Sequence, residues 1–200
     1  MLRLIAALGI ASTLLLSGCA ALVVGGATTG AVVANDRRPT EVVLGDERVE
    51  LTANTRLGKV FGDNVHINVT SFNYVVLITG EVPNEATKGQ VEALVRAIPQ
   101  VKSVVNELQV AGVSSYAARS NDTYLTGKVK AGFVSGDKFS ANDVKVVTEA
   151  GVVYLMGLVT RKEAEDATEA ARSTGGVRKV VRVFEYIAQA PQRAPAKPAS

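Results

Sequence analysis

The sequence predicts an α+β fold made of two tandem copies of one αββαβ unit. Two pairs of matching segments support this prediction. Val75–Val82 and Val152–Val159 are nearly continuous apolar runs separated by 77 residues along the chain. Residues 101–105 and 177–181 share the pattern Val-x-x-Val-Val at a separation of 76 residues. Because the matching segments follow one another in the same order at nearly constant spacing, the chain is interpreted as a duplication.

A helix is expected to open each copy. In both copies apolar residues recur every four positions, which is the spacing of one face of an amphipathic helix. These residues are Val49, Ala53 and Leu57 in the first copy and Leu125, Val129 and Phe133 in the second. Asp46 and Asp122 precede the two runs, and aspartate is a favoured N-cap residue. We therefore expect both helices to begin at these aspartates.

Two strands are expected to follow each helix. Residues 65–70 alternate apolar and polar side chains, as in a strand with one buried face, and residues 144–147 are the shorter counterpart. Turns are expected at residues 71–73 and 149–151. The next strands are the two apolar runs described above, and such continuity is typical of strands covered on both faces.

A second helix and a third strand complete each unit. The helix is expected to begin near Asn84 in the first copy. In the second copy Thr160 and Glu163 have the spacing of a capping box, which marks a helix N-terminus. The third strands are expected over residues 101–110 and 177–187. A unit of this size buries a limited core, so we expect one copy to pack on the other.

The N-terminus has the organisation of a secretory signal peptide over residues 1–18, with Arg3 before an uncharged apolar run and small residues after it. That run is shorter than the about 20 residues that a membrane-spanning helix needs. The signal ends in Leu16-Ser17-Gly18-Cys19, which matches the bacterial lipobox, so Cys19 is the expected lipid attachment site. The alternative is an ordinary secretory signal with an incidental cysteine. Ala20 favours the outer membrane, by resemblance to the usual lipoprotein sorting rule.

The segments outside the two copies are expected to have no packed core of their own. Residues 19–45 are interpreted as a lipidated tether that lies near the bilayer surface, and residues 112–121 as a short polar linker. Residues 188–200 are rich in alanine and proline and are expected to form a disordered tail.

Composition argues against an enzyme and against nucleic-acid binding. The chain has 22 basic and 19 acidic side chains, a net charge of +3, which is too small a surplus to indicate a nucleic-acid partner. It contains one histidine, His66, and one cysteine, Cys19, which is committed to lipid. We therefore expect no catalytic triad, no histidine- or cysteine-based metal site and no cofactor. The carboxylates at 163–169 are interpreted as a solvated helix face.

These motifs together resemble a known family, the BON domain. The shared pattern is an aspartate before the apolar helix stripe, then a hairpin with apolar-x-Gly-x-Val, a helix, and Val-x-x-Val-Val. Asp36-Arg37-Arg38 and Asn121-Asp122-Thr123 add to the resemblance, which covers residues 36–187. It implies two BON domains, at 46–111 and 122–187, each with a three-stranded mixed sheet packed against two helices. Two such domains behind a lipobox resemble the outer-membrane lipoproteins named for division- and outer-membrane-stress-associated lipid binding.

The resemblance implies that the first helix of the second domain binds anionic phospholipid, such as phosphatidylglycerol or cardiolipin, and that the protein supports the outer-membrane barrier. The expected lipid-contacting residues are Tyr124, Leu125, Gly127, Lys128, Lys130 and Ala131. Tyr124 lies off the core stripe, and a tyrosine one turn from a lysine suits a membrane interface. Members of the family often have tryptophan at this position, so tyrosine predicts weaker binding. The corresponding helix of the first copy has mixed charge, in Glu47, Arg48, Glu50 and Arg56.

Two alternatives remain open from the sequence. The helix of the second copy is also consistent with a solvated surface that carries incidental lysines. The whole protein is also consistent with a periplasmic interaction module that binds envelope proteins or cell-wall polymer without recognising lipid headgroups. Strand order, the placement of one copy on the other and the oligomeric state are not specified by these patterns.

Overall fold

The computed structural model describes residues 36–62 and 65–191. The predicted signal peptide 1–18, the Cys19 attachment site, most of the predicted tether and residues 192–200 of the predicted tail lie outside the described residues. Within the described residues, none of the helices combines the length and the apolar character that crossing a membrane would require.

The first copy contains two helices and a mixed sheet. Its elements in chain order are α3 (Thr40–Phe61), β1 (His66–Phe72), β2 (Val75–Val82), α4 (Glu85–Arg96), β3 (Ser103–Asn106) and β4 (Gln109–Val110). Strand β2 is central, antiparallel to β1 and parallel to both β3 and β4. The single third strand expected over residues 101–110 is therefore interrupted. The interruption has a packing reason, because Leu108 leaves the ladder and is buried in the core.

The second copy repeats this architecture with an unbroken third strand. Its elements are α5 (Tyr116–Gly136), the short 3-10 helix η2 (Ala141–Asp143), β5 (Lys145–Glu149), β6 (Val152–Val159), α6 (Arg161–Arg172) and β7 (Lys179–Tyr186). Strand β6 is central, antiparallel to β5 and parallel to β7. Thr160 and Glu163 form the predicted capping box at the start of α6, and Asn84 caps α4. The α+β fold with two αββαβ units is thus confirmed.

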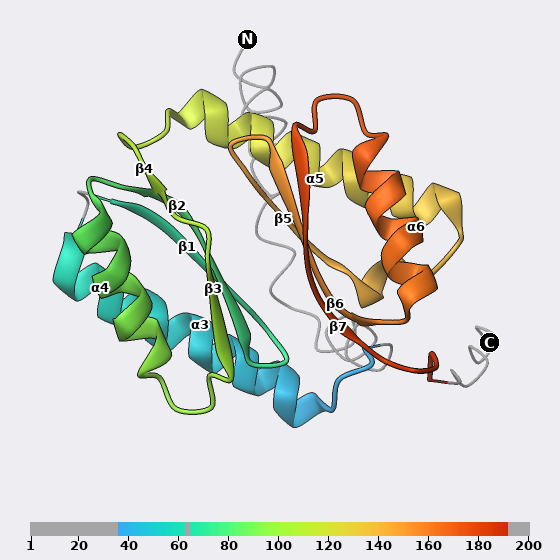
Figure 1. Ribbon diagram of the computed structural model, residues 1–200, viewed down its shortest axis with the longest axis horizontal. Helices are drawn as coiled ribbons and strands as arrows, with labels where there is room; N and C mark the ends of the chain where they lie inside the picture. The colour runs from blue at the N-terminus through green and yellow to red at the C-terminus, as the bar shows by residue number, and fades with distance from the viewer. Residues whose placement is uncertain (1–35, 63–64, 192–200) are drawn as a thin grey trace, which may run out of the picture. The chain divides into compact units, whose positions relative to one another are not determined.

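The helices of each copy cover one face of its sheet, and the opposite faces of the two sheets pack against each other (Figure 1). In the first copy α3 and α4 bury one core with alternate residues of β1 and β2, and α5 and α6 do the same in the second copy. A third cluster, which we call the inter-sheet layer, joins the copies. It is centred on Phe72, Leu77, Tyr154 and Met156. The central strands are consequently buried on both faces, as their continuous apolar sequence predicts.

The first helix of each copy begins earlier than expected, so Asp46 and Asp122 are not N-caps. Helix α3 begins at Thr40, inside the predicted tether, and α5 begins at Tyr116, inside the predicted linker. Ser115 caps α5 by accepting a hydrogen bond from the Ala118 amide. Both aspartates lie within the helices and are buried.

Each buried aspartate instead binds the β-hairpin turn of its own copy. Asp46 accepts hydrogen bonds from the backbone amides of Asn73 and Tyr74, both at 2.8 Å. Asp122 accepts equivalent bonds from Ala150 and Gly151, at 2.9 and 2.8 Å. All four turn residues have positive φ, as in the two-residue turns that best match strand twist. Three of them are not glycine, so the aspartates hold a backbone conformation that those residues rarely adopt.

The glycine of the apolar-x-Gly-x-Val pattern is required by a close backbone approach. A Cβ at Gly80 would collide with the carbonyl oxygen of His66, and a Cβ at Gly157 would collide with that of Asp143. Gly80 also has a φ of 117°, in the region that favours glycine. Gly80 therefore allows β1 to lie close against β2, and Gly157 allows the backbone of η2 to lie close against β6.

Candidate functional site

The outer face of α5 is the surface on which the predicted lipid-contacting residues lie. Leu125, Val129 and Phe133 point inward and are buried, as expected from their spacing. The opposite face exposes large apolar side chains: Tyr124 is 63% exposed and Val134 is 70% exposed. The two residues are ten positions apart, nearly three turns, and the exposed Gly127 and Ala131 lie between them on the same side of the helix.

Most of the predicted lipid-contacting residues are accessible, and one is not. Tyr124, Gly127, Lys130 and Ala131 are exposed, and Lys128 is partly exposed. Leu125 is only 3% exposed, so its inclusion among the lipid-contacting residues was wrong. Its side chain packs inward beside Gly176, where it fixes the position of the helix. Tyr116, at the start of α5, is exposed on the same side as Tyr124 and was not anticipated.

Lys128 and Lys130 differ in how free their charges are. The Lys128 ammonium donates a hydrogen bond of 2.8 Å to the carbonyl oxygen of Gly175, beyond the end of α6. It also lies 5.5 Å from the centre of the Tyr124 ring, within the range of a cation–π contact. Lys130 is exposed. Lys128 therefore orients the tyrosine and ties α5 to α6, whereas Lys130 presents its charge to the surroundings.

The exposed charges of α5 are of one sign, whereas those of α3 are of both signs. The one acidic residue between Tyr116 and Gly136 is Asp122, which is buried against the hairpin turn, so every exposed charge of α5 is basic. Helix α3 exposes Leu44 and Leu51 but places Glu41 and Glu47 beside them. An anionic surface would consequently attract α5 and not α3.

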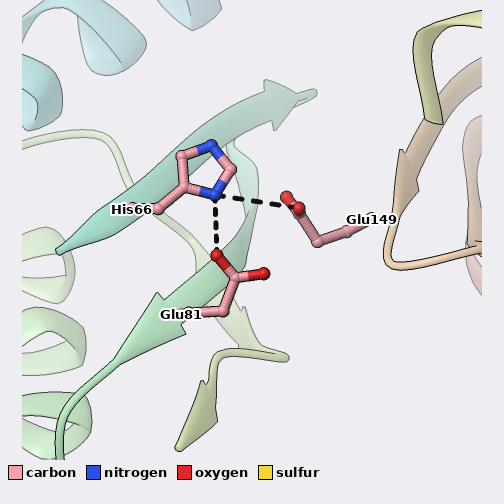
Figure 2. Close-up of side chains that lie close together, drawn as sticks. All are labelled: His66, Glu81 and Glu149. Atoms are coloured by element: carbon pink, nitrogen blue, oxygen red, sulfur yellow. Dashed lines mark hydrogen bonds and ion pairs between the residues drawn. The ribbon is translucent and has the colours of Figure 1, made fainter. Parts of the chain in front are cut away.

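A second group of polar side chains lies between the two copies, and the sequence patterns did not predict it. Figure 2 shows His66 of β1, Glu81 of β2 and Glu149 of β5 pointing toward one another. His66 Nδ1 lies 2.9 Å from Glu81 Oε2 and 3.8 Å from Glu149 Oε1. Glu81 is 6% exposed and Glu149 is 5% exposed. The low count of histidines and cysteines did not predict this group, because two of its three members are carboxylates that come from separate strands.

A cavity of about 230 Å³ adjoins this cluster. Its lining is polar and comes from β1, α5 and β5: His66, Asn68, Arg119, Asp122, Thr123, Thr126, Thr148 and Glu149. The space is large enough for several water molecules, and its walls offer the polar partners that ordered water needs.

The other end of the interface is held by arginines that precede α3. Arg37 forms ion pairs with Asp143 and Glu163 of the second copy, at 2.8 and 2.6 Å. Arg38 pairs with Asp46 at 2.7 Å, and its guanidinium lies 3.8 Å from the centre of the Phe72 ring. The segment that the sequence suggested was part of a tether therefore binds both copies at this end.

Comparison with known proteins agrees with this architecture. The chain is 37% identical over 178 residues to the outer membrane lipoprotein DolP of Haemophilus influenzae, which covers 88% of this chain and 92% of that protein. It is 29% identical over 154 residues to the 21 kDa hemolysin of Actinobacillus pleuropneumoniae, covering 76% and 79% of the two chains. It is also 30% identical over 136 residues to the osmotically-inducible protein Y of Escherichia coli K12, covering 65% and 68%.

The family model described as BON domain matches the chain twice, at residues 46–112 and 121–188. Each match begins inside the first helix of its copy, at or one residue before the hairpin-binding aspartate, and extends past the last strand. The chain therefore belongs to the BON-domain family, as a member with two tandem BON domains related to an outer-membrane lipoprotein.

Proposed function

We propose that the protein is a lipid-anchored lipoprotein of the outer membrane that binds anionic phospholipid through the outer face of α5 and supports the outer-membrane barrier. The single observation that carries this proposal is the composition of that face: an exposed tyrosine and an exposed valine on a helix whose own exposed charges are all basic. Aromatic rings with a polar tip favour the headgroup region of a bilayer. A basic side chain close to an anionic surface contributes about 1 kcal/mol.

The direction of the charges supports anionic over zwitterionic lipid. Phosphatidylglycerol and cardiolipin carry net negative charge, so Lys130 and Lys128 would be attracted to them in addition to the apolar contact. Exposed charges are screened over about 8 Å at physiological salt. Binding through this face should consequently weaken as the salt concentration rises.

The anchor proposed for the protein is Cys19, at the end of the lipobox. The name of the Haemophilus influenzae relative, an outer membrane lipoprotein, supports this location. Replacing Cys19 with serine should leave the mature protein without acyl groups and release it from outer-membrane fractions. Mass spectrometry of the mature N-terminus tests this directly, and a wild-type protein without acyl groups would rule the anchor out.

Vesicle co-sedimentation tests the lipid-binding face. Residues 36–200 form a compact unit and can be compared on vesicles with and without phosphatidylglycerol or cardiolipin. Tyr124→Glu should abolish binding, because it places a carboxylate at the interface without touching the Leu125, Val129 and Phe133 core. Tyr124→Trp should strengthen binding. Circular dichroism confirms that each variant is folded.

Leu51→Glu on α3 is the matched control. Leu51 is 69% exposed, so this change also adds a carboxylate to an exposed apolar position of a first helix. It should leave vesicle binding unchanged. If folded Tyr124→Glu binds vesicles like the wild type, α5 is not the lipid site. The interaction-module alternative would then be favoured, with the exposed Leu44 and Leu51 of α3 as its contact surface.

A further inference from the structure

We propose that His66, Glu81 and Glu149 bind a divalent transition-metal ion of the zinc type, which links the two BON domains. This site is separate from the lipid-binding face and does not depend on it. His66 and Glu81 belong to the first copy and Glu149 to the second, so one ion would bond to both copies.

The geometry of the three side chains fits a small metal ion (Figure 2). One ligand atom from each residue lies within 4.8 Å of the other two. A tetrahedral zinc ion with bonds of about 2.0–2.1 Å holds its ligand atoms about 3.3 Å apart. The observed distances from His66 Nδ1, 2.9 Å to Glu81 and 3.8 Å to Glu149, lie on either side of that value.

The backbone fixes these side chains in place. His66 and Glu81 are paired across β1 and β2, so their side chains project from the same face of the sheet. That face is turned toward the second copy, because Phe72 of the same strand lies in the inter-sheet layer. Surrounding groups orient the ligands further. Asn68 donates to Glu149 Oε2 at 2.8 Å, and the Ser114 amide donates to Glu81 Oε2 at 3.1 Å. Such outer contacts are typical of metal ligands.

The negative charge of the two carboxylates also favours a bound cation. Among the described residues, His66 is the one ion-pair partner found for Glu81 and for Glu149. A single imidazolium balances one of the two carboxylates. A divalent ion bound to the imidazole would balance both carboxylates.

At the opposite end of the interface, the residues equivalent to His66 and Glu81 contact an arginine. The counterparts of His66 and Glu81, at the hairpin offset of 77, are Asp143 and Leu158. There the cation is Arg37, which pairs with Asp143 and donates to the carbonyl oxygen of Leu158 at 2.8 Å. At the helix offset of 76, Arg37 and Arg38 correspond to Val113 and Ser114, which carry no charge. Arg119 lines the adjoining cavity, but among the described residues no arginine forms an ion pair with Glu81 or Glu149.

The ligand set selects the class of metal. An imidazole ligand suits zinc and its neighbours in the first transition row, whereas magnesium and calcium prefer oxygen ligands alone. Three protein ligands leave a fourth position for water, and the adjoining cavity of about 230 Å³ can supply it. Zinc is thus the appropriate probe.

The test uses the full chain without a histidine tag, treated with chelator and then titrated with zinc. His66 is the only histidine in the sequence, so the imidazole nitrogen spectrum of histidine-labelled protein reports this site alone. One equivalent of zinc should shift the Nδ1 resonance and raise the melting temperature. In competition with a chromophoric zinc chelator, His66→Ala and Glu149→Gln should each weaken binding at least 100-fold.

Glu165→Gln is the matched control, because Glu165 is an exposed carboxylate on α6. It should bind zinc like the wild type. The imidazole measurement needs no variant, so it decides the matter even if a ligand variant does not fold. An imidazole spectrum that is unchanged at one equivalent of zinc would overturn the proposal. Equal zinc affinity in folded His66→Ala and wild type would overturn it as well.

Discussion

Arg37 Nη2 lies 2.6 Å from Glu163 Oε1, and Arg37 Nη1 lies 2.9 Å from Glu163 Oε2, across 126 residues of sequence. The two parallel contacts form a bidentate pair, the strongest geometry available to arginine and carboxylate. Glu163 also completes the capping box of α6. A residue that precedes the first domain is therefore bonded to the first turn of the last helix, which couples the two copies electrostatically.

This pair makes stability depend on pH in a defined window. Arg37, by donating its hydrogen bonds, lowers the pKa of Glu163 from 4.5 to about 2. A carboxyl with a depressed folded-state pKa stabilises the fold fully above its unfolded value, here 4.5, and the contribution is lost as the pH falls toward 2. We expect about 1–2 kcal/mol from Glu163, less than the full shift would give, because the group is partly exposed to solvent.

Arg37→Ala should accordingly lower the free energy of unfolding at pH 7 and flatten its decline between pH 4.5 and 2. Urea unfolding at a series of pH values measures both effects. Arg48→Ala, at an exposed position of α3, is the control and should follow the wild-type curve. Parallel curves for Arg37→Ala and wild type across this window would show that the pair does not stabilise the fold.

Asp46 and Asp122 should be among the most sensitive positions of the first helices. Asp46→Asn or Asp122→Asn replaces an oxygen that accepts turn amides, and leaving buried donors without partners costs about 1–3 kcal/mol. Asp46→Asn should cost more, because Asp46 also accepts from Arg38 and Ser71. Chemical denaturation measures the loss. Glu47→Gln, at a neighbouring exposed position, is the control. An equal loss of unfolding free energy in that variant would show that the hydrogen bonds from the aspartates to the turns contribute nothing specific.

The same aspartates show what local sequence can and cannot predict. The apolar spacing placed the buried faces of α3 and α5 correctly, because burial periodicity is a local property of a helix. The helix starts were wrong, because the donors that satisfy Asp46 lie 27 and 28 residues further along the chain. An aspartate before an apolar run has the same local pattern whether it caps a helix or binds a distant turn.

Gly80→Ala and Gly157→Ala should both destabilise the protein, by about 2 kcal/mol or more. At each position a Cβ would meet a backbone carbonyl, which cannot move without disturbing the hairpin. Gly89→Ala is the control, because that helical glycine has open space around its Cβ position and alanine is the better helix former. In thermal melts the first two variants should have lower melting temperatures than the wild type, and the control should have an equal or higher one. A Gly80→Ala melt that matches the wild type would show that the hairpin can relax.

Alanine substitutions of Lys128 and Lys130 should have different effects on vesicle binding and stability. Lys130→Ala should cost about 1 kcal/mol of affinity for phosphatidylglycerol vesicles and reduce the salt dependence, since its charge is free. Lys128→Ala should also lower the melting temperature, because it breaks the hydrogen bond to Gly175. Arg56→Ala on α3 should leave binding unchanged. Equal binding of Lys130→Ala and wild type would contradict an electrostatic contribution from this face.

The two groups of functional residues differ in how visible they are in the sequence. The face of α5 was predictable, because exposure and charge on one helix follow from residues within 21 consecutive positions. The cluster of His66, Glu81 and Glu149 was not, because it requires the pairing of β1 with β2 and the packing of one copy on the other. Leu125 lies on the apolar stripe with Val129 and Phe133, so its burial followed from the helix spacing, and its inclusion among the lipid-contacting residues conflicted with that spacing.

The inter-sheet layer has a consequence for how such a pair of domains diverges. Phe72 and Leu77 are covered by Tyr154 and Met156, so a substitution on this side of one copy must be accommodated by the other. The outer helical faces carry no such mutual constraint. After a duplication, α3 and α5 can therefore acquire different surface chemistry while the inter-sheet layer stays the same. The proposed use of a single copy for membrane binding is compatible with this arrangement, because the membrane-binding face and the inter-sheet layer lie on opposite sides of that copy.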